Sequence, residues 1–249
     1  MYKGIYIAAS GSMMKQRQME TVSNNLANAA TYGYKEDGVT FRDYLMTEFS
    51  ERGAEDQEGA ALGTAGKSSD GRIMTYVSDV YTDHSGGGMI NTNNPLDVAI
   101  DGSGYFALEG DKYTRAGNFT LNSEGFITNA KGVKVLGSGG PIQVPEGKLE
   151  ISSSGDVAVN GIVIDRLRVV EFADKTKLRK EGESNYVTTE PVIESASSLK
   201  QGYLESSNVN VIQEMVNMIN LHREYESNQK IIQVFDEASG KIANEMARV

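Results

Sequence analysis

The chain contains few residues that could carry out chemistry, and their spacing matches no catalytic or metal-binding pattern. Its 249 residues include two histidines, His84 and His222, and no cysteine. A metal centre or a catalytic triad needs several such groups at one place, and two distant histidines supply few members. No serine stands in the Gly-x-Ser-x-Gly setting of a hydrolase nucleophile. We therefore expect no catalytic residue, no metal ligand, no cofactor and no enzyme activity, and we expect both histidines to be solvated or to lie at the edge of a helix seam.

Two glycine-rich runs and one group of acids resemble ligand sites only superficially. The runs 86–88 and 101–104 do not open onto a helix that carries a Lys-Ser or Lys-Thr pair, so they predict turns and not phosphate loops. Four carboxylates lie near the second run, at Asp97, Asp101, Glu109 and Asp111. Their spacing does not follow the alternating ligand positions of a calcium loop. We expect these segments to be ordinary strands and turns.

The composition is that of a folded, acidic chain. Hydrophobic residues make up 39% of the sequence, enough for a core, and the formal net charge is -10. Nucleic acids and anionic membrane surfaces both require clustered lysine and arginine. No stretch reaches the roughly 20 apolar residues that span a bilayer, and the polar run from Ser10 to Glu20 is unlike a secretory signal. We expect no nucleic-acid partner, no direct membrane insertion and no cleaved signal peptide.

Both ends of the chain carry a seven-residue apolar repeat, which is typical of helices that pack in a coiled coil. The positions that we expect to form this seam are Met218, Leu221, Tyr225, Ile232, Phe235 and Ile242 near the C-terminus and Met19, Val22 and Leu26 near the N-terminus. The N-terminal repeat is interrupted by Ser12 and Lys15. Because such a narrow stripe buries little by itself, each end should pack against the other end or against a neighbouring chain. Asn210, followed by Gln213, predicts the start of the last helix.

The residues between these ends predict β-structure. Short strands separated by turn signals about every ten residues indicate an antiparallel domain and not βαβ units. The clearest hairpin spans 157–164, because its central Asn160-Gly161 pair suits a two-residue turn. The expected fold class is α+β, with N- and C-terminal helices pairing as a coiled coil around a central antiparallel β-rich domain. The expected segments are an N-terminal axial helix at 1–33, an arm or loop region at 34–89, the β-rich domain at 90–202 and a C-terminal axial helix at 203–249.

Three local questions stay open at this level. Residues 34–49 mix aromatic and charged side chains and could form a helix or an extended arm. Residues 51–72 are poor in large apolar side chains and form either a plain connector or a loop that a partner orders. The asparagines Asn24, Asn25 and Asn28 either weaken and cap the first helix or form buried hydrogen bonds that fix the register between helices.

Three separated motifs resemble those of the bacterial flagellar axial family, which comprises rod, hook and hook-associated proteins. Residues 23–35, Ser-Asn-Asn-Leu-Ala-Asn-Ala-Ala-Thr-Tyr-Gly-Tyr-Lys, resemble its N-terminal signature, and residues 202–226 resemble its C-terminal one. Residues 94–106 and 113–119, which include Tyr-Thr-Arg-Ala-Gly-Asn-Phe, are similar to its β-core. The motif positions that we single out are Asn24, Asn25, Leu26, Asn28, Gly33, Asn208 and Asn210.

Within this family the length resembles the rod members more than the longer hook members. Residues 135–142 and 166–174 look like the proximal-rod branch, FlgF. Residues 205–211 and 214–220 are closer to the distal-rod branch, FlgG. We therefore expect a proximal-rod protein, with a distal-rod protein as the alternative.

The resemblance implies a structural subunit that the flagellar type III export apparatus carries without a cleaved signal peptide. It would assemble in the periplasm with other rod subunits and with itself into a helical tube that transmits torque from the motor to the hook. The family implies no enzyme activity and no cofactor. A more remote alternative is a soluble β-domain binding module with a coiled-coil oligomerisation tail.

Overall fold

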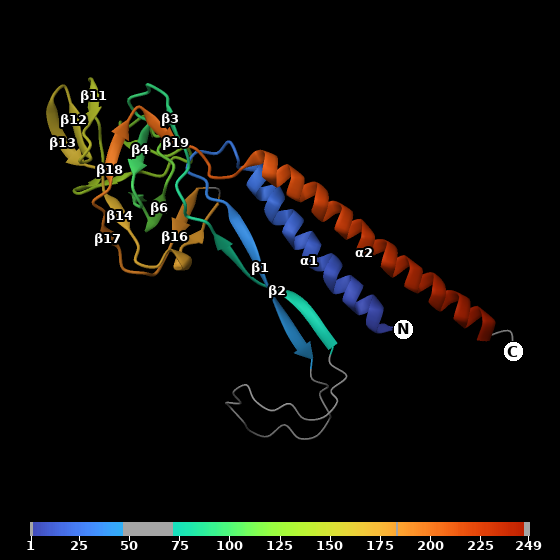
Figure 1. Ribbon diagram of the computed structural model, residues 1–249. Helices are drawn as coiled ribbons and strands as arrows, with labels where there is room; N and C mark the ends of the chain where they lie inside the picture. Colours follow the sequence, from blue (N-terminus) through green and yellow to red (C-terminus); the bar gives the residue numbers. More distant parts are fainter. Residues whose placement is uncertain (1, 47–71, 183, 247–249) are drawn as a thin grey trace, which may run out of the picture. The chain divides into compact units, whose positions relative to one another are not determined.

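The computed structural model describes residues 2–46, 72–182 and 184–246 (Figure 1). Contacts within the chain divide it into two compact units. Unit 1 comprises residues 1–21, 39–80 and 217–249, and unit 2 comprises residues 22–38 and 81–216. The loop expected at 51–72 lies outside the described residues except for Arg72, which begins a strand.

Two long helices lie near the ends of the chain, α1 (Tyr2–Ala27) and α2 (Val211–Met246). The predicted start of the last helix is confirmed, because Asn210 Oδ1 accepts hydrogen bonds from the backbone N–H groups of Ile212 at 3.1 Å and Gln213 at 3.2 Å. These bonds satisfy donors that have no partner inside the helix. In the described part of the chain, neither helix is apolar enough over its length to cross a membrane.

The strands include a pair formed by β1 (Asp37–Met46) and β2 (Arg72–Thr82). Residues 37–46 are therefore extended, which favours the arm for this part of the segment 34–49, and residues 47–49 lie outside the described residues. In unit 1 the Thr40 hydroxyl donates to the backbone oxygen of Asp79 at 3.2 Å. In unit 2 the Thr82 hydroxyl donates to the Asp37 carboxylate at 2.6 Å.

The remaining strands build unit 2. They are β3 (Met89–Asn91), β4 (Val98–Asp101), β5 (Tyr105–Leu108), β6 (Lys112–Thr114), β7 (Thr120–Leu121), β8 (Ile127–Thr128), β9 (Leu136–Gly137), β10 (Gly140–Pro141), β11 (Leu149–Ile151), β12 (Asp156–Val159), β13 (Ile162–Arg166), β14 (Val169–Glu171), β15 (Arg179–Lys180), β16 (Asn185–Val187), β17 (Ile193–Glu194), β18 (Ser198–Gln201) and β19 (Tyr203–Glu205), with a 3-10 turn η1 (Lys175–Lys177). The largest sheet has the order β15-β16-β6-β5-β14-β17, and all its pairs are antiparallel. With two helices and an antiparallel β-domain, the α+β class is confirmed.

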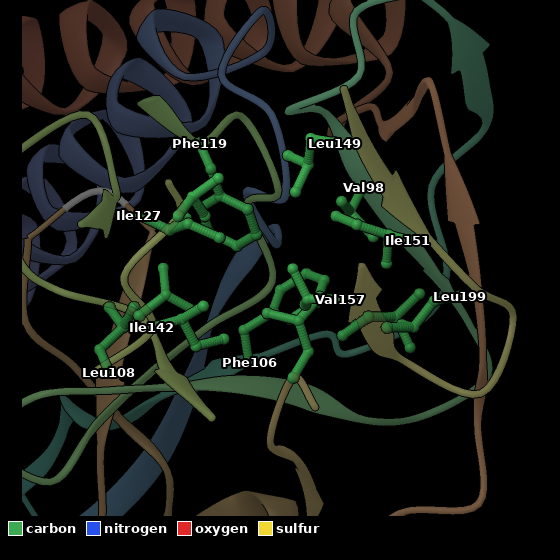
Figure 2. Packing of buried hydrophobic residues seen from close by; sticks show 14 of the residues in the cluster. Val98, Phe106, Leu108, Phe119, Ile127, Ile142, Leu149, Ile151, Val157 and Leu199 are labelled. Carbon is green, nitrogen blue, oxygen red and sulfur yellow. The ribbon is translucent and has the colours of Figure 1, made fainter. Parts of the chain in front are cut away.

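The core of unit 2 is organised around β5, whose alternating side chains enter two apolar clusters. Phe106 and Leu108 belong to the larger cluster, which Figure 2 shows packed around Phe106 and Val157. Tyr105 and Ala107 belong to the smaller cluster on the other side. Each large side chain buried in this way contributes about 1.5–3 kcal/mol relative to exposure in water. A strand covered on both sides is a rigid support for the turns that follow it.

The predicted hairpin at 157–164 is confirmed. Val159 pairs with Ile162, and the two turn residues Asn160 and Gly161 have φ angles of 51° and 82°. Positive φ at both positions is the geometry that matches the twist of the flanking strands.

Candidate functional site

The two helices lie side by side within unit 1 (Figure 1). Lys15 of α1 forms an ion pair with Glu224 of α2 at 2.5 Å. Further along, a Cβ atom added to Gly4 would lie 2.6 Å from the Phe235 ring. The absence of a side chain at Gly4 therefore makes room for Phe235 against α1.

The predicted seam positions differ in how far their side chains are exposed. Those that are partly buried are Met19, Val22, Leu26, Met218, Leu221, Tyr225, Ile232 and Phe235. Ile242 is 42% exposed. The polar residues that interrupt the N-terminal repeat have partners, because the buried Ser12 hydroxyl donates to the backbone oxygen of Ala8 at 2.9 Å and Lys15 pairs with Glu224. Polar groups are tolerated at such positions when they are hydrogen-bonded.

Both helices also carry large apolar side chains that remain exposed. Those on α1 are Tyr6, Ile7 and Met13, and those on α2 are Val211, Ile212, Met215, Val216, Ile219, Ile231, Val234 and Ile242. The most exposed are Ile212 at 77% and Met13 at 72%. Large apolar side chains that recur as exposed residues along a helix are available for contact with another chain.

Asn25 answers the question about the helix asparagines. This side chain is 1% exposed and makes four hydrogen bonds. Its Nδ2 donates to the backbone oxygen of Asp37 at 2.9 Å and to the Glu214 carboxylate at 3.3 Å. Its Oδ1 accepts from the Tyr34 hydroxyl at 3.1 Å and from the backbone N–H of Asp37 at 3.0 Å. Asn25 therefore links α1 to α2, as the register interpretation predicts.

The neighbouring asparagines act locally. Asn28 donates from its side chain to the backbone oxygen of Asn24 at 2.9 Å, and its Oδ1 accepts from the Thr31 hydroxyl at 3.2 Å. Asn24 is exposed. Asn28 fits the capping interpretation, because its side-chain bonds stay within one turn of the end of α1, where Asn24 contributes its backbone oxygen.

A buried cluster of charged side chains in unit 2 joins the segment after α1 to the segment before α2. We call residues 28–37, after α1, the N-terminal segment, and residues 203–210, before α2, the C-terminal leader. Glu205 of the leader bonds Lys35 of the N-terminal segment through Oε1 at 2.6 Å and the Arg115 Nε through Oε2. The exposed fractions of these residues are 3% for Glu205, 1% for Lys35 and 6% for Arg115. Ions buried this deeply are stable only when they are paired and hydrogen-bonded.

Backbone groups complete the cluster. The Arg115 guanidinium donates to the carbonyl oxygens of Ile100 at 3.1 Å, Gly102 at 2.6 Å and Gly104. The backbone N–H of Gly87 donates to Glu205 Oε1 at 2.9 Å. A Cβ atom at Gly87 would lie 1.9 Å from the backbone oxygen of Ser206, so only glycine lets the chain approach the leader here. The run 101–104 forms the predicted turn between β4 and β5, whereas residues 86–88 are an irregular segment before β3, and backbone groups of both runs bind the cluster.

Two opposing effects set the ionisation of the cluster. Burial alone would raise the pKa of Glu205, but Arg115, Lys35 and the Gly87 N–H hold this pKa below its usual value. Burial lowers the pKa of Lys35, and the contact with Glu205 opposes that shift. The carboxylate is therefore charged throughout the neutral range.

Asn208 and Gly33 tie the same two segments together beside the cluster. The Asn208 Oδ1 accepts a hydrogen bond from the backbone N–H of Glu36 at 2.8 Å, and its Nδ2 donates to the backbone oxygen of Asp83 at 3.0 Å. The backbone N–H of Gly33 donates to the backbone oxygen of Glu205 at 2.9 Å. The leader therefore contacts the N-terminal segment through side chains and backbone.

Replacing Gly33 with alanine is expected to destabilise unit 2 by about 2–4 kcal/mol. Gly33 has a φ angle of 67°, and an added Cβ atom would lie 2.4 Å from the backbone nitrogen of Ala116. Gly132→Ala is the matched control, because Gly132 has a φ angle of 79° but no atom within 4 Å of the added Cβ. Urea unfolding followed by circular dichroism measures both variants. Equal losses would mean that strain at positive φ, and not the contact with Ala116, sets the requirement at Gly33.

The histidines lie in different surroundings. His84 was expected to be solvated or at a helix seam, but the structure corrects this: it is partly buried in unit 2, where its Nδ1 lies 2.8 Å from the Tyr105 hydroxyl. Burial, with the nearby Lys175, Lys35 and Lys180, lowers the pKa of His84 to about 4, so the ring is neutral at pH 7. His222 is exposed on α2. Within the described residues, no group of three or more His, Cys, Asp or Glu side chains could hold a metal ion.

Three family models match separate parts of the chain. "Flagella basal body rod protein" matches residues 5–35, "Flagellar hook protein FlgE/F/G D1 domain" matches residues 99–159 and "Flagellar basal body rod FlgEFG protein C-terminal" matches residues 200–246. The flagellar basal-body rod protein FlgG of Bacillus subtilis is 32% identical over 98% of this chain and 99% of its own length. This chain belongs to the flagellar basal-body rod family. It is a structural subunit of the rod, not an enzyme, and it assembles with other rod subunits.

Relatives of more than one name align along nearly the whole chain. FlgF of Mesorhizobium japonicum is 30% identical over 91% of this chain and 90% of its own. The hook-basal body complex protein FlhO of Bacillus subtilis is 29% identical over all of both chains. These similarities identify the rod family and leave the branch within it open.

The buried cluster draws one charge from each matched region of this rod protein. Lys35 lies in the first region, Arg115 in the second and Glu205 in the third. None of them was among the site residues predicted from the sequence, although all lie inside the motifs that carry the resemblance. The available signal was a charged residue within each motif, and sequence spacing alone does not pair such charges.

Proposed function

We propose that this chain is a proximal-rod subunit whose paired terminal helices form the inner layer of a helical tube and whose β-rich domain forms the outer layer. The observation that carries this proposal is the exposed apolar surface on both helices. One helix pair covers only one side of each helix, so neighbouring subunits must cover side chains such as Met13 and Ile212. A repeated heterologous contact that does not close into a ring generates a helical tube.

The seam of this proposed coiled coil comprises Met19, Val22, Leu26, Met218, Leu221, Tyr225, Ile232, Phe235 and Ile242. The Lys15–Glu224 ion pair and the position of Phe235 against Gly4 support pairing of α1 with α2. The exposed Ile242 then becomes buried only against a neighbouring subunit. The motif residues Asn25 and Asn208 hold the ends of these helices on the β-rich domain.

We further propose that the type III export apparatus carries the chain, without a cleaved signal peptide, to the periplasm. The sequence supports this route through its lack of cysteine, since no disulfide obstructs passage of an extended chain. A tube assembled there would transmit torque from the motor to the hook, and the outer domains would resist twist.

The distal rod is the second candidate, supported by the 32% identity with FlgG of Bacillus subtilis. Quantitative mass spectrometry of washed, detergent-extracted hook–basal bodies separates the two positions. We expect a handful of copies of this chain relative to the hook protein. A few tens of copies would move the chain to the distal rod. Absence from the particles, with motility intact in a deletion strain, would overturn the proposal and favour a soluble binding module with an oligomerisation tail.

A further inference from the structure

The Arg115 guanidinium makes three hydrogen bonds within the β-rich domain that involve neither the N-terminal segment nor the leader. Its guanidinium bonds the carbonyl oxygens of Ile100, Gly102 and Gly104, all within fifteen residues of Arg115 in the sequence. These carbonyls belong to β4 and to the turn that joins β4 to β5. The Nε–H is the donor directed at Glu205. Arg115 thus forms a positively charged receptor whose carbonyl partners all come from β4 and the turn after it, and β4 itself pairs with β18, the strand that precedes the leader.

Glu205 is the residue that connects this receptor to the N-terminal segment. One carboxylate oxygen accepts from Arg115, and the other accepts from Lys35 and from the Gly87 N–H. The Lys35 ammonium group also donates to the backbone oxygen of Ser85 at 2.6 Å. An ammonium group that is 1% exposed cannot be compensated by one carbonyl alone. Docking of Lys35 therefore depends on Glu205, while docking of Glu205 on Arg115 does not require Lys35.

The charge balance of the cluster also indicates that Lys35 depends on Glu205 more than Glu205 depends on Lys35. With Lys35, Arg115 and Glu205 ionised, the cluster holds two cations and one anion. Removing Lys35 leaves a balanced Arg115–Glu205 pair. Removing the charge of Glu205 leaves Arg115 and Lys35 without their shared buried counter-ion. The exposed Asp83 carboxylate also favours the charged form of Lys35, but its influence is smaller than that of Glu205, so the loss of Glu205 is the more costly change.

The N-terminal segment has two further bonds to the leader. Gly33 donates to the Glu205 backbone oxygen, and Glu36 donates to the Asn208 side chain. Lys180 of β15 also holds this segment, through the backbone oxygen of Lys35 at 2.6 Å and the Asp37 carboxylate at 2.8 Å. The Asp83 N–H donates to the Glu36 backbone oxygen at 2.8 Å, and the Thr82 hydroxyl donates to the Asp37 carboxylate at 2.6 Å. The segment is thus held both by the leader and by residues outside it, and the leader supplies the buried counter-ion of Lys35.

We infer that Glu205 is a positioning residue that docks the two chain ends in a fixed order. The C-terminal leader binds the Arg115 receptor first, and the N-terminal segment then binds the docked leader. The order concerns the folding of unit 2 and goes beyond the proposed place of the subunit in the rod. It makes the segment that precedes α2 a requirement for fastening the segment that follows α1.

Amide hydrogen exchange at single-residue resolution on the full chain tests this order. The amides of Gly33 and Glu36 report the N-terminal segment, and the Ser206 amide, bonded to the Gly88 oxygen at 2.8 Å, reports the leader. In Lys35→Ala we expect exchange at Gly33 and Glu36 to accelerate at least about tenfold, with Ser206 within about twofold of the parent chain. In Glu205→Gln we expect all three amides to accelerate.

The matched control is Glu181→Gln, which removes the same charge from an exposed ion pair with Lys112 at 2.8 Å and should leave the three amides unchanged. Equal acceleration of Gly33 and Ser206 in Lys35→Ala would overturn the fixed order, and so would protected Gly33 and Glu36 amides in Glu205→Gln. If Glu205→Gln does not accumulate as folded protein, Glu205→Asp, whose shorter side chain withdraws the carboxylate from both cations, must accelerate all three amides together.

A double variant separates the charge effect from a loss of packing. In the background of Glu205→Gln, Lys35→Ala removes a cation that has lost its buried counter-ion. Its effect on the urea midpoint should therefore be smaller than in the parent chain, or reversed. Strictly additive losses would contradict the role of Glu205 as the counter-ion on which Lys35 depends.

Discussion

Arg115→Met is expected to lower the free energy of unfolding of unit 2 by about 3–5 kcal/mol, the cost of removing one partner from a buried ion pair. The methionine fills much of the same space but donates no hydrogen bond. The carbonyl oxygens of Ile100, Gly102 and Gly104 would lose their guanidinium donors, and of these residues Ile100 and Gly104 are buried, where an unpaired carbonyl is costly. Glu205 would also lose one of its two cations.

Urea unfolding of the purified chain, followed by tyrosine fluorescence and circular dichroism, measures this loss. The control is Arg166→Met, because Arg166 is exposed and lies 3.5 Å from Asp156, a distance at which surface pairs contribute about 0–1 kcal/mol. A loss below about 1 kcal/mol for Arg115→Met would show that the cluster contributes little to stability, and would weaken the receptor role assigned to Arg115.

Phe235→Asp is expected to prevent incorporation of the subunit into the rod and to abolish swimming. Phe235 packs against Gly4 of α1, so a carboxylate there would be placed in the helix seam at a cost of about 2–4 kcal/mol. Unit 2 contains neither residue, and its core should remain folded in the variant.

Soft-agar swimming, immunoblots of isolated hook–basal bodies and circular dichroism of the purified chain check the three parts of this expectation. Gln233→Asp introduces the same charge at a nearby exposed position of α2 and serves as the control. Normal motility in Phe235→Asp would remove Phe235 from the proposed seam. Loss of β-structure in the purified variant would show that its effect is not confined to the helices.

Several local features could be predicted because a few adjacent residues contain the whole signal. The start of α2 is set by one side chain that bonds backbone groups two and three positions later. The hairpin at Asn160-Gly161 is set by two residues that accept positive φ. These interactions need no contact from another part of the chain.

The segment 37–46 could not be assigned because the partner that defines it is remote. Its aromatic and charged residues are compatible with either a helix or a strand. The choice depends on pairing with β2, which begins at Arg72. The environment of His84 was likewise missed because Tyr105 and Tyr186, which surround it, come from distant strands.

The sequence by itself determined the α+β class, the terminal helices with their apolar repeat, the main turns and the membership of the rod family. Only the tertiary structure decided that Asn25 is a buried link and that Asn24 and Asn28 act locally. It also decided that Lys35, Arg115 and Glu205 meet. The physical reason is that a cap or a turn is stabilised by neighbours in sequence, whereas the state of a polar or charged side chain depends on its burial and on partners that only the folded chain brings near.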